Sequence, residues 1–390
     1  MDFRMPDDIL EVQRSLLDFI DREVRPVEER FMPRILEGVE DEEMRLAGIE
    51  LRKRSAAVGF YGAHLPESVG GWGLSTLGMT VLVETVGKSG LRFGADVIVP
   101  PNPEAPTPLL LQLDEEMQQR YLVPLVKAQK RMCFALTEPN AGSDAQAIQT
   151  KAIRDGDHFL LSGVKHYITG GEYADFAVVF AVTDPDKRAH GGITAFLVDK
   201  DSPGFRVGKQ QRTMAGDTHQ AELIFEDCRV PATHIVGQEG YGFYAAMQFL
   251  NAGRAYIGAL CLGLAQHCLD VAVEYAKTRT AFGKPIGKNQ GVSFQLADSA
   301  IEIEAARWMT YRLAWLVDQG EHPMRDSSIV KVFNTEMAGR VADRAVQVLG
   351  GMGYLTEGRV ERVFRLVRMF RIVEGTSEIQ RMLVARSLGL

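Results

Sequence analysis

Near its C-terminus the chain reads RIVEGTSEIQR, residues 371–381, in which Glu374 stands between an apolar pair and a Gly-Thr-Ser turn. The glycine lets the backbone turn or lie close to a ligand. Thr376 and Ser377 can cap a helix that follows, with Glu378 in its first turn. We therefore predict that Glu374 projects from a loop at a helix start, where backbone N–H groups favour negative charge. A solvated glutamate beside a helix cap would fit the same residues.

The composition is that of a globular protein with more than one domain. The 390 residues, 46% hydrophobic and 24% charged, suffice for two or three sizeable cores. The net charge of −7 argues against a large nucleic-acid footprint. Residues 1–10 are acidic and lack a signal-like apolar run, and no stretch approaches the ~20 uninterrupted apolar residues of a membrane span. We expect a soluble, cytoplasmic protein without membrane insertion.

The spacing of cysteine and histidine favours neither a disulfide framework nor a metal site. The four cysteines form no C-x-x-C pair, which fits a reducing compartment. The eight histidines form no H-x-x-H or H-E-x-x-H arrangement. We therefore expect no bound metal.

Hydrophobic periodicity divides the chain into three predicted domains. Residues 1–130 show the 3.6-residue period of helices. Pro26 is expected to end the first of these helices. The helices are predicted over about 9–24, 41–58, 75–88 and 107–127.

Residues 131–238 change to short runs rich in Val, Ile, Phe and Thr, separated by Gly, Asp or Pro turns. Because no helices intervene, these strands predict an antiparallel barrel or sandwich. The strands are predicted at 134–136, 149–154, 158–164, 176–183, 192–199 and 220–226.

Residues 239–390 return to long helical periods joined by short loops. Such helices pack as an antiparallel four-helix bundle. The whole chain is thus predicted to be an α+β multidomain protein, with a helical domain, a β domain and a helical bundle in that order. The bundle helices are predicted over about 241–277, 289–319, 325–349 and 358–370.

Two loops outside the C-terminal stretch carry groups that suit an anionic ligand. The string TEPNAGSD, residues 137–144, follows a short strand and offers hydroxyl and backbone N–H groups. Arg279 lies in a loop with Gly and Pro between two long helices, and its guanidinium suits a pyrophosphate. Each loop taken alone is equally compatible with a solvated turn.

Together these strings resemble the acyl-CoA dehydrogenase family. Residues 137–144 match its T-E-P-x-A-G-S-D segment, residues 279–290 its R-x-x-F-G-x-x-I-x-x-x-Q segment, and residues 371–381 its C-terminal signature. The resemblance implies an FAD enzyme that converts an acyl-CoA thioester to the trans-2-enoyl-CoA, with Glu374 as base and flavin N5 as hydride acceptor. It also implies an electron-transferring flavoprotein as partner and a homotetramer built as a dimer of dimers.

The same resemblance assigns the cofactor contacts. Tyr167 stands where the family usually has a Trp against the flavin ring, and a Tyr can stack there with less area. Arg279, Phe282 and Gln290 would hold the FAD of a neighbouring subunit. The full set implied for FAD is Phe134, Leu136, Thr137, Gly142, Ser143, Tyr167, Ile168, Thr169, Arg279, Phe282, Gln290, Gln347, Val348, Gly350, Gly351, Thr376 and Glu378.

The resemblance also implies contacts with the acyl-CoA substrate. Family members without the late glutamate carry the base at the position of Gly253, so Glu374 is the candidate here. Arg254 matches a family arginine near the CoA tail, although an intramolecular ion pair explains it equally well. Val373 is smaller than the Tyr frequent in the family, which predicts an altered acyl cavity. Residues 365–368 lack the Asp of the family's R-D-A-R, and both departures leave the identity of the substrate open, though not the reaction. The implied substrate residues are Ser143, Asn251, Arg254, Val373 and Gly375.

Two other functions fit the same architecture. One is a flavin monooxygenase or oxidase, in which reduced flavin meets O₂, and the presence of Glu374 disfavours it. The other is a non-catalytic binding protein, for example one associated with DNA. The net charge of −7 and the same glutamate disfavour that reading.

Overall fold

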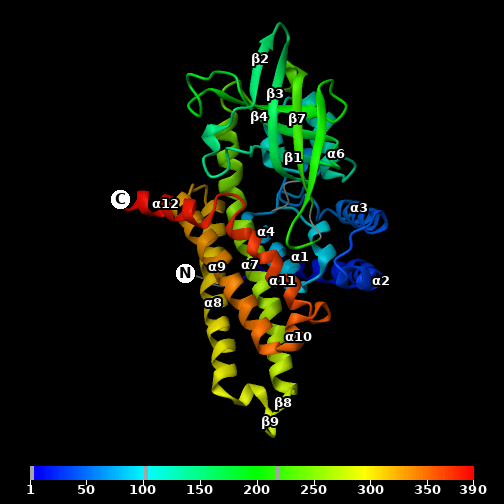
Figure 1. Ribbon diagram of the computed structural model, residues 1–390, viewed down its shortest axis with the longest axis vertical. Helices are drawn as coiled ribbons and strands as arrows, with labels where there is room; N and C mark the ends of the chain where they lie inside the picture. Colours follow the sequence, from blue (N-terminus) through cyan, green and yellow to red (C-terminus); the bar gives the residue numbers. More distant parts are fainter. Residues whose placement is uncertain (1–3, 101–103, 217–218) are drawn as a thin grey trace. The chain divides into compact units, whose positions relative to one another are not determined.

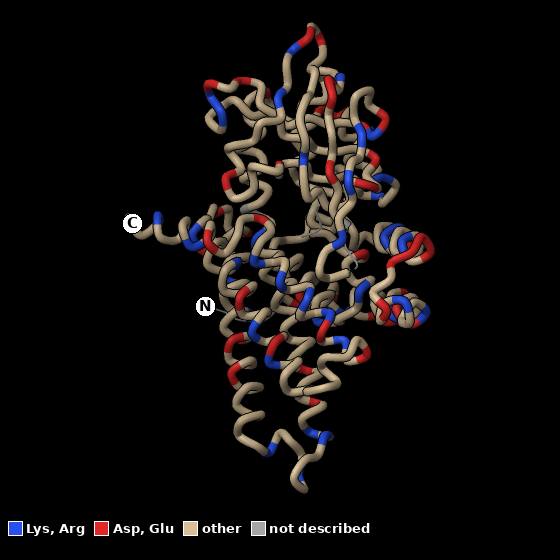
Figure 2. The backbone as a smooth tube through the Cα atoms, viewed as in Figure 1, with Lys and Arg blue, Asp and Glu red and all other residues tan. Residues whose placement is uncertain are grey.

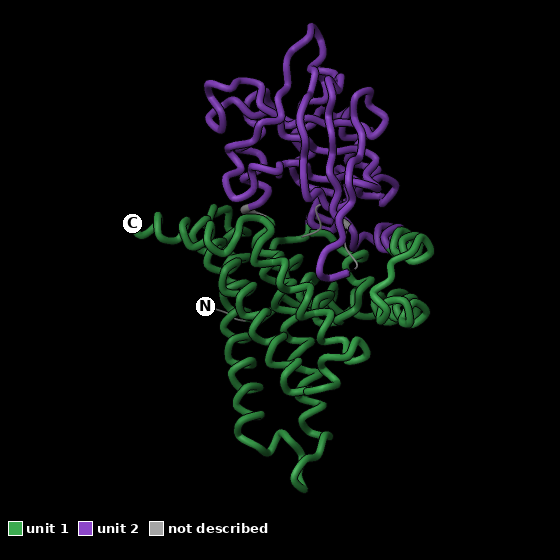
Figure 3. The backbone as a smooth tube through the Cα atoms, viewed as in Figure 1, with its two compact units in different colours: residues 1–51, 74–101, 252–390 green, residues 52–73, 102–251 purple. Residues whose placement is uncertain are grey.

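The computed structural model describes residues 4–100, 104–216 and 219–390, apart from the side chains of His219, Asn251 and Ala252. The chain divides into two compact units, coloured separately in Figure 3. Unit 1 comprises residues 1–51, 74–101 and 252–390, and unit 2 comprises residues 52–73 and 102–251. The division into domains at 130 and 238 stays a prediction, because these units are built from several segments of the chain.

Unit 2 contains a seven-stranded sheet within its described residues (Figure 1). The strand order is β1-β4-β2-β3-β7-β6, with β5 beside β4. The β architecture expected for the middle of the chain is therefore confirmed. The strands are β1 (Met132–Ala135), β2 (Lys151–Asp155), β3 (His158–Thr169), β4 (Phe176–Val182), β5 (Ile193–Asp199), β6 (Phe205–Arg212) and β7 (His219–Pro231).

Most neighbouring strands are antiparallel, as expected, but β4 also has parallel partners. Met132 of β1 lies opposite Phe176 of β4 in a parallel register, and β2 meets β4 at Lys151 and Val182. Parallel strands need a long connection. The β2–β3 hairpin supplies one, because it lets the chain return beside β1 in the same direction.

One strand of this sheet was not predicted. β6 reads FRVGKQQR and most of its residues are exposed. It pairs with β7 alone at the end of the strand order, and a polar edge strand lacks the apolar alternation that marks a strand in a sequence. β7 is also longer than the predicted 220–226, since its C-terminal half pairs with the start of β3.

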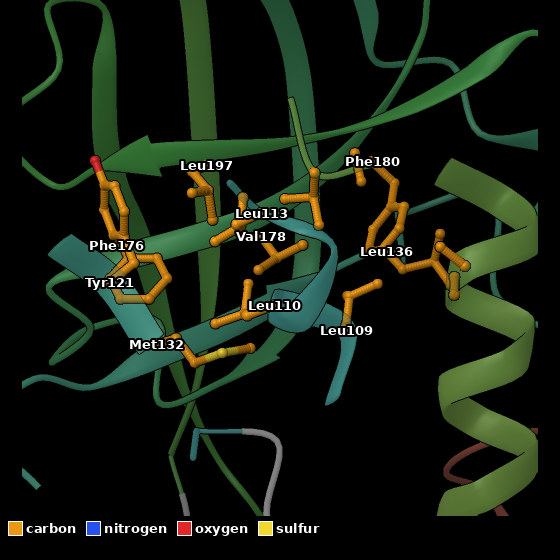
Figure 4. Packing of buried hydrophobic residues seen from close by; sticks show 14 of the residues in the cluster. Leu109, Leu110, Leu113, Tyr121, Met132, Leu136, Phe176, Val178, Phe180 and Leu197 are labelled. Carbon is orange, nitrogen blue, oxygen red and sulfur yellow. The ribbon is translucent and has the colours of Figure 1, made fainter. Parts of the chain in front are cut away.

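The helix predicted over 107–127 is confirmed in part: the chain is interrupted at residues 113–114, and three short helical turns then follow one another without a break over 115–126. Asp114 interrupts the run by accepting a hydrogen bond from the backbone N–H of Met117 at 2.8 Å, which caps a new turn. Leu109 and Leu110 are buried and pack with residues of β4 and β5, as Figure 4 shows. The turns are Pro108–Gln112, Glu115–Met117, Gln118–Leu122 and Val123–Val126.

Unit 1 is helical, and its long helices match the predicted ranges closely. α9 packs against α8, α11 and α12, so it is the centre of the C-terminal bundle (Figure 1). The helices are α1 (Asp7–Phe19), α2 (Arg25–Leu36), α3 (Glu42–Ala57), α4 (Thr76–Ser89), α7 (Gly242–Thr278), α8 (Gln290–Asp318), α9 (Met324–Leu349), the short α10 (Gly351–Tyr354), α11 (Val360–Val367) and α12 (Ser377–Ser387), and α3 and α7 extend into unit 2.

The prediction that Pro26 ends the first helix is wrong. A π-helical turn, Ile20–Val24, joins α1 to α2, and Pro26 lies in the first turn of α2. Proline disrupts a regular helix because it lacks the N–H and its ring meets the carbonyl four residues earlier. The wider π turn, in which the Arg25 N–H reaches the carbonyl of Ile20, lets the chain stay helical through this point.

α4 and α7 cross so closely in unit 1 that their backbones touch. A Cβ added at Gly263 of α7 would lie 2.2 Å from the carbonyl oxygen of Glu84 and 2.9 Å from the Cα of Gly87. A Cβ added at Gly87 would lie 2.8 Å from the carbonyl oxygen of Leu260. Glycine at both positions is therefore required for this crossing.

α7 is also the one described helix that is long and apolar enough to cross a membrane, judged by length and composition alone. Of its most apolar 18-residue window, 67% is buried within the folded chain. That burial is the behaviour of a core helix.

We predict that Gly263→Ala lowers the free energy of unfolding by at least about 2 kcal/mol, because backbone atoms cannot move aside as a flexible side chain can. Urea or thermal unfolding monitored by circular dichroism measures the change. Gly291→Ala in α8 is the matched control, since a Cβ there would meet no atom within 4 Å. Equal stability of the two variants would show that the crossing tolerates a side chain.

Candidate active site

Glu374 lies in a strained turn of unit 1 that precedes α12. Its φ is 53° and that of Gly375 is 86°, so two consecutive residues adopt the left-handed region. That conformation is uncommon for a residue with a side chain and persists only where the surroundings enforce it. Thr376 caps α12 by accepting a hydrogen bond from the Ile379 N–H at 3.3 Å, as the sequence predicts for this helix start.

Two buried side chains hold the carbonyl groups of this turn. Lys331 Nζ, from α9, donates to the carbonyl oxygen of Gly375 at 2.7 Å. Gln380 Nε2, from the first turn of α12, donates to the carbonyl oxygens of Glu374 and Gly375 at 3.2 Å each. The sequence carries no signal for either contact, because Lys331 and Gln380 occupy positions that suit a solvated helix face.

The carboxylate of Glu374 is partly withdrawn from water. Its Oε2 atom is buried and makes no hydrogen bond with the described residues, although the residue as a whole is partly exposed. Burial raises the pKa of Glu374 to about 7, against the opposing charges of Arg254 and Lys331. The group is thus poised to gain or release a proton near neutral pH.

Gly253, on α7, leaves the space beside this carboxylate open. A Cβ added at Gly253 would lie 3.0 Å from Glu374 Oε2, so any side chain there would compete with the carboxylate for room. The next residue, Arg254, is 4% exposed, and burial lowers the pKa of its guanidinium. The structure therefore brings Glu374, Gly253 and Arg254 together, while the side chain of Asn251 lies outside the described residues.

The remaining predicted residues of this turn have separate environments. Val373 is partly buried and packs against the core of the C-terminal helices. Glu378 is exposed in the first turn of α12. Of the two, Val373 is the residue that can line an apolar cavity.

In unit 2, an internal ion pair fixes the loop that follows β1. Lys165 Nζ, in β3, donates to the Leu136 carbonyl at 3.0 Å and to Glu138 Oε1 at 2.8 Å. The other oxygen of Glu138 accepts the backbone N–H of Gln149 at 2.6 Å, and Oε1 also accepts that of Thr150 at 2.9 Å. Sequence reasoning assigned no role to Lys165 or Glu138. Their ion pair joins two separate stretches of sequence, residues 137–139 and residues 163–167.

The other predicted residues of unit 2 lie along the end of β1, its loop and β3. The Thr137 carbonyl accepts the His166 N–H at 2.9 Å, which ties the loop to β3. Tyr167 has a φ of 57°, is 59% exposed and stacks on the ring of His166 at 4.1 Å. Thr169 donates to Gln220 Oε1 at 3.0 Å. The packing of the others ranges from buried to exposed: Leu136 and Ile168 are buried, Phe134 lies against Phe180, and Gly142 and Ser143 are exposed.

A third group of predicted residues lies far from Glu374 within unit 1. Arg279 and Phe282 belong to a short hairpin, β8 (Thr280–Ala281) and β9 (Lys284–Pro285), which joins α7 to α8 beside Gln290. Phe282 is 98% exposed. α7 runs from Gly253 to this hairpin without a break, and at about 1.5 Å per residue it separates the two by roughly 37 Å. The structure does not bring these residues to the same place as Glu374.

Gln347 and Val348 form the last turn of α9, followed by Gly350 with a φ of 60°. A Cβ added at Gly350 or Gly351 would meet nothing within 4 Å. The backbone of this turn is therefore accessible to a ligand.

Comparison with known proteins assigns this arrangement to a family. Models of the N-terminal, middle and C-terminal domains of acyl-CoA dehydrogenases match residues 6–129, 133–228 and 240–389. An acyl-CoA dehydrogenase of Bacillus subtilis (strain 168) is 38% identical over 379 residues, which cover 97% of each chain. The chain belongs to the acyl-CoA dehydrogenase family. It is therefore an oxidoreductase of the acyl-CoA dehydrogenase type, whose cofactor is FAD.

Two further relatives are informative. The solved structure of butyryl-CoA dehydrogenase from Megasphaera elsdenii has a TM-score of 0.87 and 36% identity, and covers 100% of both chains. The CarC subunit of the caffeyl-CoA reductase–Etf complex of Acetobacterium woodii is 38% identical over 341 residues, 87% of this chain and 89% of that one. The expected three-part fold of the acyl-CoA dehydrogenases is thus confirmed.

The residues of this acyl-CoA dehydrogenase fit FAD on structural grounds. Gly142, Gly350 and Gly351 leave open space where a Cβ would stand, which allows close approach of a ligand to the backbone. Tyr167 presents an exposed ring for stacking, and Arg279 an exposed guanidinium for a pyrophosphate. Among the described residues, no group of three or more His, Cys, Asp or Glu could hold a metal ion.

We predict that Lys165→Met lowers both stability and FAD content. Glu138 would be left buried without its cation, and breaking such a pair costs about 3–5 kcal/mol. Burial raises the pKa of Glu138, whereas the charge of Lys165 brings it below its usual value. Without Lys165 the pKa of Glu138 should rise, so the loss of stability should be largest at a pH where this carboxyl is still ionised. Thermal unfolding and the ratio of flavin absorbance to protein measure the two effects. The double variant Lys165→Met/Glu138→Gln should recover part of the stability, and no recovery would contradict the pairing argument.

Proposed function

We propose that this acyl-CoA dehydrogenase removes two hydrogens between Cα and Cβ of an acyl-CoA thioester, with Glu374 as the base that takes the α-proton. One observation supports the role of Glu374 above all. Its Oε2 is buried, free of hydrogen bonds to the described residues, and faces the open position at Gly253. A general base works best with a pKa near the working pH, and burial places the pKa of Glu374 at about 7.

The turn that carries Glu374 also supplies a means to activate the substrate. Removal of the α-proton places negative charge on the thioester carbonyl oxygen, which hydrogen-bond donors stabilise. We propose that the backbone N–H of Glu374 donates to this oxygen, while Gly253 leaves room for the acyl chain beside the carboxylate. FAD, when bound, supplies the two-electron acceptor for the hydride lost from Cβ. The product would be the trans-2-enoyl-CoA.

We propose an electron-transferring flavoprotein as the acceptor of these electrons. The support is the relative from Acetobacterium woodii, which is named as a subunit of a reductase–Etf complex and shares 38% of its residues over 87% of this chain. The size of the acyl group is set by the cavity wall. Because Val373 is smaller than the Tyr frequent in the family, we propose that the cavity admits a wider acyl chain.

We propose that the protein is a homotetramer in which the hairpin of one chain contacts the FAD of another. The roughly 37 Å of α7 between Gly253 and the hairpin is longer than the distance between the ring and the pyrophosphate of one FAD. α8 also exposes a row of large apolar side chains seven residues apart, which suits packing against a second chain. The members of this row are Phe294, Ile301, Trp308 and Trp315, each between 43% and 67% exposed.

The charge distribution supports an enzyme over a nucleic-acid-binding protein. Figure 2 shows Lys and Arg interspersed with Asp and Glu along the backbone of each unit. With a net charge of −7, the chain offers little attraction to a phosphate backbone. The four cysteines are free and buried, which supports a reducing compartment such as the cytoplasm.

We expect Glu374→Gln to lower the rate of substrate-dependent flavin reduction by ~10²–10⁴-fold, because the amide keeps the shape but cannot accept the α-proton. Anaerobic bleaching of the flavin by butyryl-CoA measures the rate. The variant should retain FAD, since the residues proposed to hold the cofactor are unchanged. Glu357→Gln, an exposed carboxylate before α11, is the control and should bleach normally. Bleaching of the Glu374 variant at the wild-type rate would exclude Glu374 as the base.

Arg279→Ala should weaken FAD retention and subunit assembly together, since the guanidinium is proposed to bind a cofactor held by the neighbouring chain. Flavin content after gel filtration and the mass from analytical ultracentrifugation report the two properties. Lys277→Ala removes a positive charge two residues away, in the last turn of α7, and should change neither. An Arg279 variant with full flavin and unchanged mass would contradict the contact between subunits.

A further inference from the structure

Lys331 is a lysine with no solvent exposure in the middle of the helical bundle of unit 1. An ammonium group inside a protein is costly unless it is paired and hydrogen-bonded. Its Nζ lies 2.7 Å from the Gly375 carbonyl, which belongs to the residue directly after Glu374. The ammonium group of Lys331 is thus placed beside the turn that carries the proposed base. Lys331 and Gly375 are 44 residues apart in the sequence.

We propose that Lys331 is a positioning residue for Glu374: it fixes the turn that carries the carboxylate, and its charge keeps that carboxylate ionised at working pH. This inference rests on the proposed role of Glu374 as the base. Lys331 then has a mechanical effect on the turn and an electrostatic effect on the carboxylate. Different substitutions of Lys331 and Gln380 distinguish the two effects.

The mechanical effect follows from the conformation of the turn. Glu374 and Gly375 both have positive φ values, and a carboxylate-bearing residue does not keep this conformation unaided. Lys331 and Gln380 both donate to the Gly375 carbonyl, from α9 and α12 respectively. Two donors on the Gly375 carbonyl fix the peptide plane after Gly375, and Gln380 also donates to the Glu374 carbonyl, which fixes the plane between Glu374 and Gly375. Together these bonds restrict the backbone that carries the Glu374 side chain.

The electrostatic effect depends on which charges face Lys331. From α7 these are Arg254, of the same sign, and Cys261, whose pKa is raised by burial so that the thiol stays neutral. From α9 it is Glu336, which pairs with Arg371 at 3.2 Å and with Arg381 at 3.6 Å. The two remaining carboxylates are Glu378, which is exposed to water, and Glu374. The field of Lys331 therefore acts chiefly on Glu374.

The charge of Lys331 should also affect the pH dependence of kcat/KM. Burial raises the pKa of Glu374, while Arg254 and Lys331 oppose that rise and leave the pKa at about 7. Only the ionised carboxylate accepts a proton, so kcat/KM falls as the pH drops through this pKa. Without the charge at position 331 the pKa of Glu374 rises further, and the acidic limb of the profile moves to higher pH. Burial also lowers the pKa of Lys331 to about 8, which is still above that of Glu374, so Lys331 carries its charge along the acidic limb, below the pKa of Glu374.

The test compares three substitutions in the holoenzyme. Lys331→Met removes the charge and the donor, Lys331→Arg keeps a charge, and Gln380→Met removes only neutral donors from the same turn. The acidic limb of kcat/KM against pH, with butyryl-CoA and a dye acceptor, should move up by roughly one pH unit in Lys331→Met. That corresponds to about a tenfold lower kcat/KM well below the pKa. Lys331→Arg should keep the wild-type limb, and Gln380→Met should lower the rate without moving it.

An infrared titration of the protonated carboxyl of Glu374 gives a second readout that does not depend on turnover. The band is assigned by its loss in Glu374→Gln, and its midpoint should move with the kinetic limb in Lys331→Met. If the Met variant does not fold, Lys331→Gln removes the charge while keeping a neutral donor, and its acidic limb should move in the same direction. If neither neutral variant folds while the Arg variant does, Lys331 is a structural residue and the proposal is overturned.

The outcomes separate this inference from the function on which it rests. An active Glu374→Gln would exclude Glu374 as the base, whatever happens at position 331. An inactive Glu374→Gln together with an unmoved limb and an unmoved infrared midpoint in Lys331→Met would leave the base in place and overturn the role of Lys331.

Discussion

The burial of Glu374 Oε2 away from water is the constraint that the side chains around this turn of unit 1 must satisfy. A carboxylate that is desolvated at Glu374 Oε2 gains basicity, but a buried negative charge must be balanced. The balance comes from Arg254 on α7 and Lys331 on α9, both of which are themselves buried. The long helices thus do more than enclose an apolar core, since they also bring two cations to one turn.

In each of the two units, a buried lysine holds an irregular segment in the same way. In unit 2, Lys165 donates from β3 to the Leu136 carbonyl, and in unit 1, Lys331 donates from α9 to the Gly375 carbonyl. Both lysines have no solvent exposure, and burial lowers the pKa of each to about 8. In each case a cation on a rigid element fixes the backbone of an irregular segment. Loops that contact ligands need this support, because they lack the regular hydrogen bonding of a helix or strand.

The sequence predicts the long elements and the helix cap after Glu374 better than the contacts that hold the Glu374 turn. α7, α8 and α9 are predicted within a residue or two, because their apolar positions repeat over several turns. The cap of α12 at Thr376 is predicted because its signal is local. β6 was not predicted, because a polar edge strand lacks the alternation of apolar residues. The end of the first helix was predicted wrongly at Pro26, because a π turn accommodates this proline within a continuing helix. Lys331 reads as a surface residue, since only the fold reveals a partner 44 positions away.

The crossing of α4 and α7 has a consequence for how this protein can vary. Where side chains form a contact, a loss on one helix can be restored by a larger residue on the other. At Gly87 and Gly263 main-chain atoms form the contact, so no replacement on either helix can restore it. Gly263 lies ten residues after Gly253 on α7. The backbone contact at Gly263 fixes the position of α7 along α4. Residues of the turn such as Val373 can therefore change in size, while the frame that brings the carboxylate to its neighbours stays the same.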